Sequence, residues 1–351
     1  MKKAKVEFKN ITKKFNETVA VNNVSCTFEP GTLTTLLGPS GCGKTTSLRI
    51  VAGLERATSG QILIDDEDVT ILPATERDVS MVFQSYALFP HMSVMENVSY
   101  GLRMINKSKE EYTEKALNTL ELVGLKGYQD RMPSELSGGQ QQRVAVARAI
   151  VLEPKVLLFD EPLSNLDAKL RRQVREDIRS LQQSLGVTTI YVTHDQEEAL
   201  AISDNIIVMK DAVISQQGSP RDLYNFPSNK FVANFIGDSN IVDATIISNQ
   251  QNNYEIKIGN KTFKIQSKLK AQSSPHVSIR PDKIIILKSS KDNDLEGQIE
   301  SASFVGGSMQ YKVKTSIGEF YVVQYDTVNT FKKSEKVFLN FSEESIKLLS
   351  D

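Results

Sequence analysis

The sequence predicts an α/β domain built on a parallel sheet, followed by a small all-β domain. Apolar, β-branched runs alternate with helix-like segments up to about residue 236, and a glycine-rich turn at 38–45 joins one such run to a helix. Strands separated by helices imply a parallel sheet covered on both faces. From residue 241 onward the segments read as short strands separated by turn formers, which favours a small barrel or sandwich. We therefore expect domains at 1–236 and 241–351.

The composition is that of an ordinary globular protein. The 351 residues carry a formal net charge of -1, and 40% of them are hydrophobic, which argues against disorder and against collagen-like or disulfide-scaffold classes. No apolar run approaches the ~20 residues that a membrane span needs. The balanced charge gives no general electrostatic case for binding nucleic acid. Two cysteines, Cys26 and Cys42, cannot form a disulfide framework and suit a reducing cytoplasm.

The first domain divides into recognisable elements. Residues 5–11 and 19–28 read as strands, and 31–37 is apolar and β-branched, as a buried strand should be. A helical pattern runs from about 46 to 54, and 108–150 is rich in helix-forming spacing. Residues 156–159 form a short apolar run before two acids. In the second domain we expect strands at 253–258, 261–265, 283–287, 310–314 and 319–324.

The turn at 38–45 fits the phosphate-loop pattern G-x-x-x-x-G-K-[ST]. Glycines let successive backbone N–H groups turn inward around phosphate oxygens, and the following helix offers its positive N-terminus to the same anion. The lysine supplies charge to the β- and γ-phosphates, and the hydroxyl next to it is placed for Mg²⁺. We expect the loop and the next residue to bind nucleotide: Gly38, Pro39, Ser40, Gly41, Cys42, Gly43, Lys44, Thr45 and Thr46.

The apolar run at 156–159 ends in a pair of acids. Buried carboxylates are costly unless a cation or a proton accompanies them. Together with the phosphate loop, this pattern predicts that Asp160 holds Mg²⁺ and that Glu161 polarises the attacking water as a general base. Without the loop, an exposed acidic turn would explain the pair equally well.

A third motif makes a family visible. Ser137-Gly138-Gly139-Gln140, before a helix expected from about Gln141, resembles the signature motif of ATP-binding-cassette (ABC) ATPases. The resemblance implies a P-loop NTPase cassette with a RecA-like core and a helical signature subdomain. It also implies a head-to-tail homodimer, in which each signature faces the phosphate loop of the other subunit. Residues 231–237 and 278–282 resemble the close of such a cassette and part of a TOBE domain, a small OB-like β-domain.

The other motifs of the family follow in order. Gln84 resembles the glutamine that binds Mg²⁺ and the water, and His194 resembles the switch histidine at the γ-phosphate. Asp167 belongs to a segment resembling the D-loop, in which Asn165 departs from the commoner Ala. Phe15 occupies the place of the aromatic that stacks on adenine, although a role in the core is the competing interpretation. ATP and Mg²⁺ are the implied ligands.

The resemblance also implies partners. Residues 85–102 resemble the groove that receives a helix of a membrane-spanning permease subunit, and an apolar groove with a polar rim suits such docking. We expect a peripheral protein on the cytoplasmic face of the bacterial plasma membrane, under two permease subunits, served by a periplasmic or extracellular binding protein. The chain is most similar to ferric-iron importer ATPases. Import of polyamine, sugar, phosphonate or thiosulfate, with a ligand-sensing C-terminal domain, is the alternative.

Two other classes of cassette ATPase fit less well. A DNA-repair or chromosome-type ATPase would carry a long coiled coil between Gln84 and the signature motif, where only about fifty residues lie. A translation-type protein would carry two cassettes, whereas this chain has one phosphate loop. We expect no nucleic-acid partner.

Overall fold

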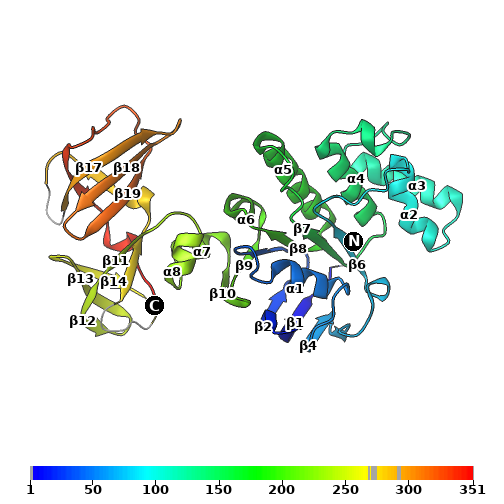
Figure 1. The fold of residues 1–351 in the computed structure, drawn as a ribbon, viewed down its shortest axis with the longest axis horizontal. Coiled ribbons are helices and arrows are strands. Elements are labelled where there is room, and N and C mark those ends of the chain that lie inside the picture. The colour runs from blue at the N-terminus through cyan, green and yellow to red at the C-terminus, as the bar shows by residue number, and fades with distance from the viewer. Residues whose placement is uncertain (1–2, 268, 270–274, 291–293, 351) are drawn as a thin grey trace. The chain divides into compact units, whose positions relative to one another are not determined.

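The computed structural model describes residues 3–267, 269, 275–290 and 294–350. The chain divides into two compact units, one ending at Pro220 and one beginning at Arg221 (Figure 1). Across the described ranges, no helix is long and apolar enough to cross a membrane.

The first unit carries ten strands and six helices in its described part, with two short 3₁₀ turns. The strands are β1 (Val6–Phe15), β2 (Thr18–Phe28), β3 (Leu33–Leu37), β4 (Ser59–Ile64), β5 (Glu67–Asp68), β6 (Val79–Val82), β7 (Val156–Asp160), β8 (Thr188–Thr193), β9 (Asn205–Lys210) and β10 (Val213–Gly218). The helices are α1 (Lys44–Val51), α2 (Val94–Met104), α3 (Lys109–Leu122), α4 (Gly138–Ile150), α5 (Ala168–Leu185) and α6 (Gln196–Ile202), with η1 (Ala74–Glu76) and η2 (Pro133–Glu135).

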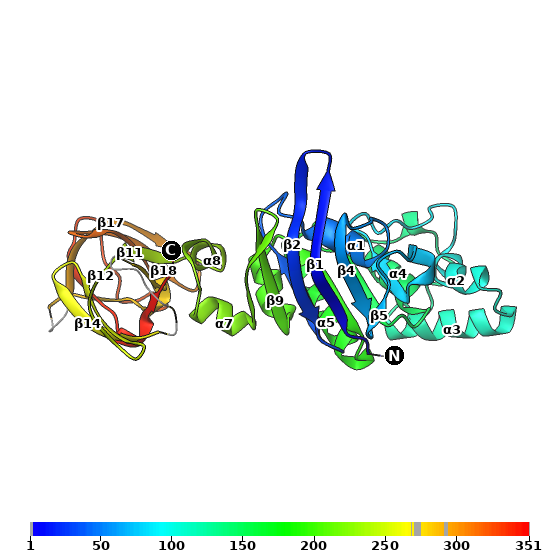
Figure 2. The ribbon, with the colours of Figure 1, turned by 90° about the horizontal axis from the view of Figure 1, so that it is seen from below.

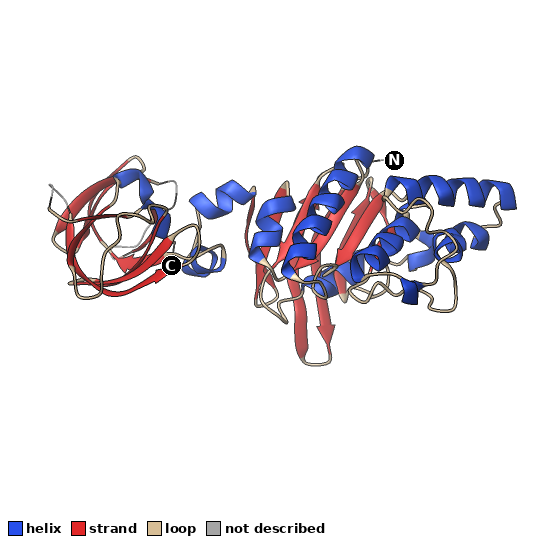
Figure 3. Ribbon diagram, turned by 90° about the horizontal axis from the view of Figure 1, so that it is seen from above, coloured by secondary structure: helices blue, strands red, loops and turns tan. Residues whose placement is uncertain are grey.

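A six-stranded sheet forms the centre of this unit, in the order β10-β9-β3-β8-β7-β6. Its strands are parallel except β10, which pairs antiparallel with β9 at one edge. Alternate residues of β7 enter different cores: Leu157 and Phe159 pack with the helices, and Val156 and Leu158 pack on the opposite face. The sheet is therefore buried on both faces, as the alternation of strands and helices predicts. Figure 3 shows the helices that lie over one of these faces.

A second, antiparallel sheet, β2-β1-β4-β5, lies across α1 from the central sheet. Leu48, Ile50 and Val51 of α1 share one apolar core with Val6 and Phe28 of this sheet. The β1–β2 hairpin extends beyond the body of the unit in Figure 2, and Phe15 pairs with Thr18 beside its turn. Each predicted strand here is present, with β1 continuing to Phe15.

The second unit is rich in strands, as predicted, and the structure pairs these strands antiparallel. Its elements are α7 (Pro220–Asn225, which starts at the division), α8 (Lys230–Phe235), β11 (Asn240–Asp243), β12 (Thr245–Gln250), β13 (Asn253–Ile258), β14 (Lys261–Gln266), β15 (His276–Ile279), η3 (Pro281–Lys283), β16 (Ile285–Leu287), β17 (Leu295–Phe304), β18 (Met309–Thr315), β19 (Gly318–Gln324), β20 (Lys336–Asn340), η4 (Glu343–Ser345) and β21 (Ile346–Leu348). The strands form sheets β11-β15-β21, β12-β13-β14 and β16-β20-β17-β18-β19 around one apolar core.

The division at Pro220 lies before the boundary at 236–241 that the change of sequence texture suggests. The physical reason is Arg280, which is buried in the second unit and donates to backbone carbonyls of the preceding segment. Its guanidinium reaches Tyr224 O at 2.8 Å, Ala233 O at 2.7 Å and Asp238 O at 2.9 Å. Residues 221–239 contain helices, but the hydrogen bonds from Arg280 attach them to the β-domain.

Candidate active site

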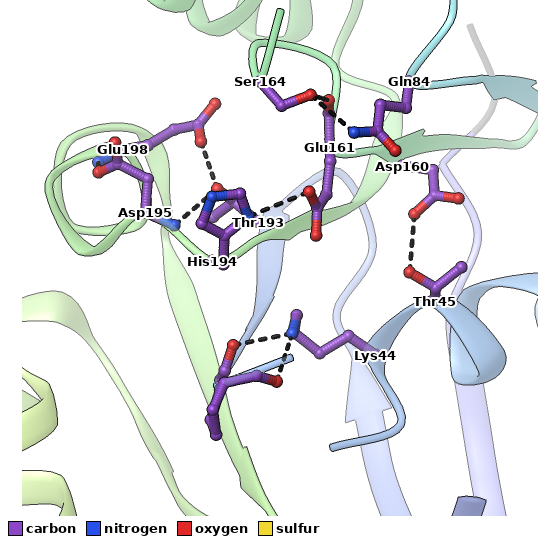
Figure 4. Close-up of polar contacts among 12 residues, drawn as sticks. Lys44, Thr45, Gln84, Asp160, Glu161, Ser164, Thr193, His194, Asp195 and Glu198 are labelled. Carbon is purple, nitrogen blue, oxygen red and sulfur yellow. Dashed lines mark hydrogen bonds and ion pairs between the residues drawn. The ribbon is translucent and has the colours of Figure 1, made fainter. Parts of the chain in front are cut away.

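Three loops meet at the carboxyl edge of the central sheet. Leu37 at the end of β3 pairs with Thr193 at the end of β8, and Asp160 at the end of β7 pairs with Val192. The phosphate loop after β3, the acid pair at the end of β7 and His194 after β8 therefore emerge side by side (Figure 4). Ligands of open α/β sheets bind at this edge, beyond the carboxyl ends of the strands.

Two glycines of the phosphate loop leave no room for a side chain. A Cβ on Gly38 would lie 2.3 Å from Met209 O, and one on Gly43 would lie 2.3 Å from Ala20 O. Gly43 also has a φ of 103°, in the region that favours glycine. The close packing of this loop against neighbouring backbone fits a cradle for an anion.

Lys44 opens α1 and lies within the loop. Its ammonium group is buried and donates to the carbonyls of Gly38 at 2.8 Å and Pro39 at 2.9 Å. A buried ammonium group needs such acceptors, because its charge is otherwise uncompensated. The phosphate loop therefore encloses a positive charge at the N-terminus of α1.

Thr45 and Asp160 bring two oxygen-bearing side chains together at this edge. Thr45 Oγ1 donates to Asp160 Oδ1 at 3.0 Å, so a hydroxyl and a carboxylate converge. Burial raises the pKa of Asp160, and the hydrogen bond from Thr45 opposes that rise. Hard oxygen donors suit Mg²⁺, which commonly takes one or two carboxylates together with substrate phosphates. Among the described residues no group of three or more His, Cys, Asp and Glu could hold a metal unaided.

Glu161 and His194 face each other across the same edge. His194 Nδ1 lies 3.0 Å from Glu161 Oε2, and the backbone N–H of Glu161 donates to Val192 O. Glu161 has a φ of 46°, a left-handed conformation that is unusual for a residue with a side chain. Backbone strain of this kind persists where neighbouring contacts fix the conformation, and it gathers at functional sites.

Gln84 is linked to Glu161 by hydrogen bonds through Ser164, in the segment that follows β7. Gln84 Nε2 donates to Ser164 Oγ at 3.1 Å, and Ser164 Oγ donates to Glu161 O at 3.0 Å. The structure thus brings Gln84, Asp160, Glu161 and His194 to one edge from separate parts of the chain.

Glu198 is a member of this edge that sequence reasoning missed. It is buried, and its carboxylate accepts from the hydroxyls of Tyr191 and Thr193, while Asp195 N donates to Thr193 Oγ1 at 3.0 Å. Burial raises the pKa of Glu198. The sequence carries no signal for it, because Glu198 stands in a polar run at the start of α6 and only tertiary packing buries it.

The signature residues lie at the N-terminus of α4. That helix begins at Gly138 rather than near Gln141, because Ser137 caps it: Gln140 N donates to Ser137 Oγ, and Ser137 N donates to Gln140 Oε1 at 2.9 Å. Asp167 similarly caps α5. Within the described residues, no hydrogen bond or ion pair joins Ser137, Gly138, Gly139 or Gln140 to the phosphate loop.

Phe15 is not part of the core. Its side chain is 45% exposed, and the Lys13 ammonium group lies 4.5 Å from the ring centroid. The competing interpretation of Phe15 as a buried residue is therefore wrong, and its ring is open to a ligand.

Comparison with known proteins agrees with this geometry. The ABC transporter family model matches residues 21–164, and a TOBE domain model matches 277–349. The Fe(3+) ions import ATP-binding protein FbpC of Agrobacterium fabrum is 50% identical over 349 residues, with 99% of each chain covered. The corresponding protein FbpC 1 of Rhizobium meliloti is 51% identical over 345 residues, with 98% of each chain covered.

The chain belongs to the ABC family. Solved ABC cassettes share the fold of its first part. The structure of cbiO1 from Clostridium perfringens, part of an ABC transporter complex, has a TM-score of 0.58 and 30% identity, and covers 62% of this chain and 90% of its own. The cassette MJ0796, solved as a dimer bound to ADP and Pi, has a TM-score of 0.55 and 33% identity, and covers 62% of this chain and 99% of its own. The protein is thus an ABC ATPase that binds ATP, with a C-terminal TOBE domain.

Proposed function

We propose that Glu161 and His194 carry out ATP hydrolysis at the sheet edge. The observation that carries this proposal is the 3.0 Å contact between their side chains, next to the Thr45–Asp160 contact. Glu161 accepts a proton from the water that attacks the γ-phosphorus, and ADP leaves as the phosphoryl group transfers to that water. His194 holds the Glu161 carboxylate in place through Nδ1 and lies beside the γ-phosphate.

The phosphate loop and the neighbouring oxygens hold the nucleotide and its metal ion. Gly38 to Thr46 supply backbone N–H groups, and Lys44 exchanges its two carbonyl acceptors for phosphate oxygens. Thr45, Asp160 and Gln84 would hold Mg²⁺, with Asp160 acting through water, and the ion would neutralise charge on the nucleotide phosphates when bound. Phe15, exposed at its hairpin, stacks on the adenine ring.

A head-to-tail homodimer completes each site. Ser137, Gly138, Gly139 and Gln140 present a capped helix N-terminus, a ready anion site. In the part of the chain that the structure describes, no hydrogen bond or ion pair joins them to their own phosphate loop. The cassette MJ0796, solved as a dimer bound to ADP and Pi, supports a dimer here. In it, the signature residues and Asp167 of one subunit face the nucleotide of the other.

Curated relatives of this chain support an assignment as the ATPase of a ferric-iron importer. Identity of about 50% over nearly the whole chain to Fe(3+) import ATP-binding proteins carries this step. In this role the dimer docks through residues 85–102 on two membrane-spanning permease subunits, at the cytoplasmic face of the plasma membrane. A periplasmic or extracellular binding protein delivers the iron.

The hydrolytic assignment is tested by Glu161→Gln. The amide keeps the shape of the side chain but cannot accept the proton, so we expect turnover to fall by about 10²–10⁴-fold while ATP binding is retained. Phosphate release and equilibrium binding of ATP measure the two quantities. Near-normal turnover in this variant would show that Glu161 is not the base.

The substrate assignment is tested by reconstitution. The chain is combined in proteoliposomes with the permease and binding protein encoded beside it, and uptake of radiolabelled Fe(III) is compared with uptake of polyamine, maltose, phosphonate and thiosulfate. We expect ATP-dependent uptake of Fe(III) only. Uptake of another solute in its place would redirect the assignment while leaving the ATPase role intact.

A further inference from the structure

Asn165 makes a contact through its side-chain amide that an alanine could not make. Its Nδ2 donates to the backbone carbonyl of Gln84 at 3.1 Å. Asn165 itself is exposed, in the segment between β7 and α5. The contact therefore joins two loops that lie 81 residues apart in the sequence.

The same two loops are joined a second time through side chains, and the direction of each hydrogen bond is fixed. Ser164 has one hydroxyl proton, which it donates to Glu161 O at 3.0 Å, so its oxygen can only accept from Gln84. The Gln84 amide must then turn its Nε2 toward Ser164. Its carbonyl oxygen, Oε1, accepts no hydrogen bond from the described residues and stays available as a metal ligand.

The turn that follows Gln84 is also fixed by hydrogen bonds from another helix, α4. Tyr86 and Ala87 have φ angles of 60° and 48°, two successive left-handed residues with side chains. Arg148 on α4 fixes this turn by donating to Tyr86 O at 3.0 Å and Ala87 O at 2.8 Å. Gln84 therefore sits between two anchors, Asn165 on its own carbonyl and Arg148 on the turn that follows.

We propose that Asn165 is a positioning residue for Gln84. By holding the main chain of Gln84, it keeps the amide seated on Ser164 and Oε1 in place for the metal ion of the nucleotide. This inference rests on the proposed role of Gln84 as a metal ligand. The contact of Asn165 is with the Gln84 carbonyl, so the proposed effect on the metal ion passes through Gln84.

The test compares Asn165→Ala with Asn165→Asp in the full-length protein. The first removes the donor, and the second places a carboxylate against the Gln84 carbonyl in the same volume. Asn118→Ala, at an exposed position on α3, is the matched control. Binding of Mn²⁺ in the presence of a non-hydrolysable ATP analogue is measured by the electron paramagnetic resonance of free Mn²⁺. Amide hydrogen exchange of residues 83–89 is measured alongside it.

We expect Asn165→Ala to weaken Mn²⁺ binding about fivefold, the factor typical of one lost hydrogen bond between neutral groups, and Asn165→Asp to weaken it further. Exchange in residues 83–89 should accelerate in both. Metal-free affinity for the ATP analogue and the thermal midpoint should match those of Asn118→Ala. Unchanged Mn²⁺ affinity in Asn165→Ala would overturn the inference.

A double-mutant cycle with Gln84→Ala separates this inference from the proposed function. We expect Gln84→Ala to weaken Mn²⁺ binding and Asn165→Ala to add nothing to it, because both act through one side chain. Independent, additive effects would show that Asn165 acts by another route. If Gln84→Ala leaves Mn²⁺ binding unchanged, the ligand role of Gln84 fails first; if only Asn165→Ala is silent, the ligand role stands and the positioning role fails.

Discussion

At the scale of single residues, two glycines of the phosphate loop share a left-handed backbone but differ in their surroundings. Gly41 has a φ of 80°, and a Cβ there would meet nothing within 4 Å. Gly43 has a φ of 103°, and its Cβ would lie 2.3 Å from Ala20 O. The first position needs glycine for conformation alone, and the second also needs it for space.

We therefore expect Gly41→Ala to lower the free energy of unfolding by about 1–2 kcal/mol, the cost of a left-handed residue with a side chain. Gly43→Ala should cost about 2–5 kcal/mol, because displacement of packed backbone adds to the same strain. Urea unfolding of both variants gives the two values. Equal losses would show that the contact with Ala20 relaxes without cost.

The ion pair between Asp204 and Arg179 makes the free energy of unfolding depend on pH. Burial acts to raise the pKa of Asp204, but hydrogen bonds from Arg179 and from Leu33 N outweigh it, so the pKa lies below its ordinary value. Arg179 Nη1 reaches Asp204 Oδ2 at 2.9 Å, and Leu33 N reaches the same oxygen at 2.8 Å. A lowered pKa means that the ionised carboxylate stabilises the fold above about pH 4.

That stabilisation is lost as the pH falls through the folded-state pKa, where Asp204 takes up a proton. We expect Asp204→Asn to lower the urea midpoint at pH 7 and to approach the parent protein below about pH 4, since a protonated carboxyl resembles the amide. Urea titrations at pH 7, 5 and 3 check this. A difference that stays constant across the three would contradict the ionic origin.

At the scale of elements, α2 and α4 begin with the same device. Ser93 and Ser137 each cap a helix through a capping box, with Glu96 and Gln140 as their partners three residues on. The two caps should contribute alike to stability, about 1 kcal/mol each. Only the cap of α4 belongs to the signature motif, which makes the pair a matched comparison.

In a Glu161→Gln background with ATP present, we expect a dimer that Ser137→Ala abolishes and Ser93→Ala preserves. Both substitutions lose a similar helix cap, but only the first removes a group proposed to face the nucleotide of the partner subunit. Size-exclusion chromatography with light scattering measures the mass. Loss of the dimer in both variants would mean that helix stability, not a signature contact, controls dimerisation.

At the scale of the whole molecule, Arg280 decides which residues belong to the β-domain. Its buried guanidinium donates to four backbone carbonyls, all of them between residues 224 and 238. Asn240 adds a second tie, since it exchanges hydrogen bonds with the backbone of Tyr321 at 2.7 and 2.8 Å. A fragment that starts after these residues leaves a buried charge without acceptors.

We therefore expect residues 221–351 to fold alone and residues 241–351 to melt at least about 10 °C lower, or not to fold cooperatively. Unpaired donors on a buried charged group cost more than 2 kcal/mol, and 1 kcal/mol shifts the midpoint of a domain of about 100 residues by about 4–8 °C. Thermal unfolding of the two fragments, followed by circular dichroism, measures the two melting temperatures. Similar melting temperatures would favour the boundary that the sequence texture suggests.

Much of this protein could be predicted from its sequence, because the relevant signals are local. Strands of period two, a glycine-rich turn and a capped helix each arise from neighbouring residues, and β13 begins and ends where the pattern predicts. The residue types of the phosphate loop and of the signature motif follow from the chemistry of anion binding. Their roles in catalysis stay predictions until the variants above are measured.

Local patterns in the sequence are enough to predict the two domain classes, the family resemblance and the residues that its motifs carry. The burial of Glu198, the anchoring of residues 221–239 by Arg280 and the contact of Asn165 with Gln84 arise only from the packing of the folded chain. These contacts join residues from 5 to 81 positions apart. Such hydrogen bonds depend on where whole elements come to rest, and no periodicity or spacing in a single segment encodes that.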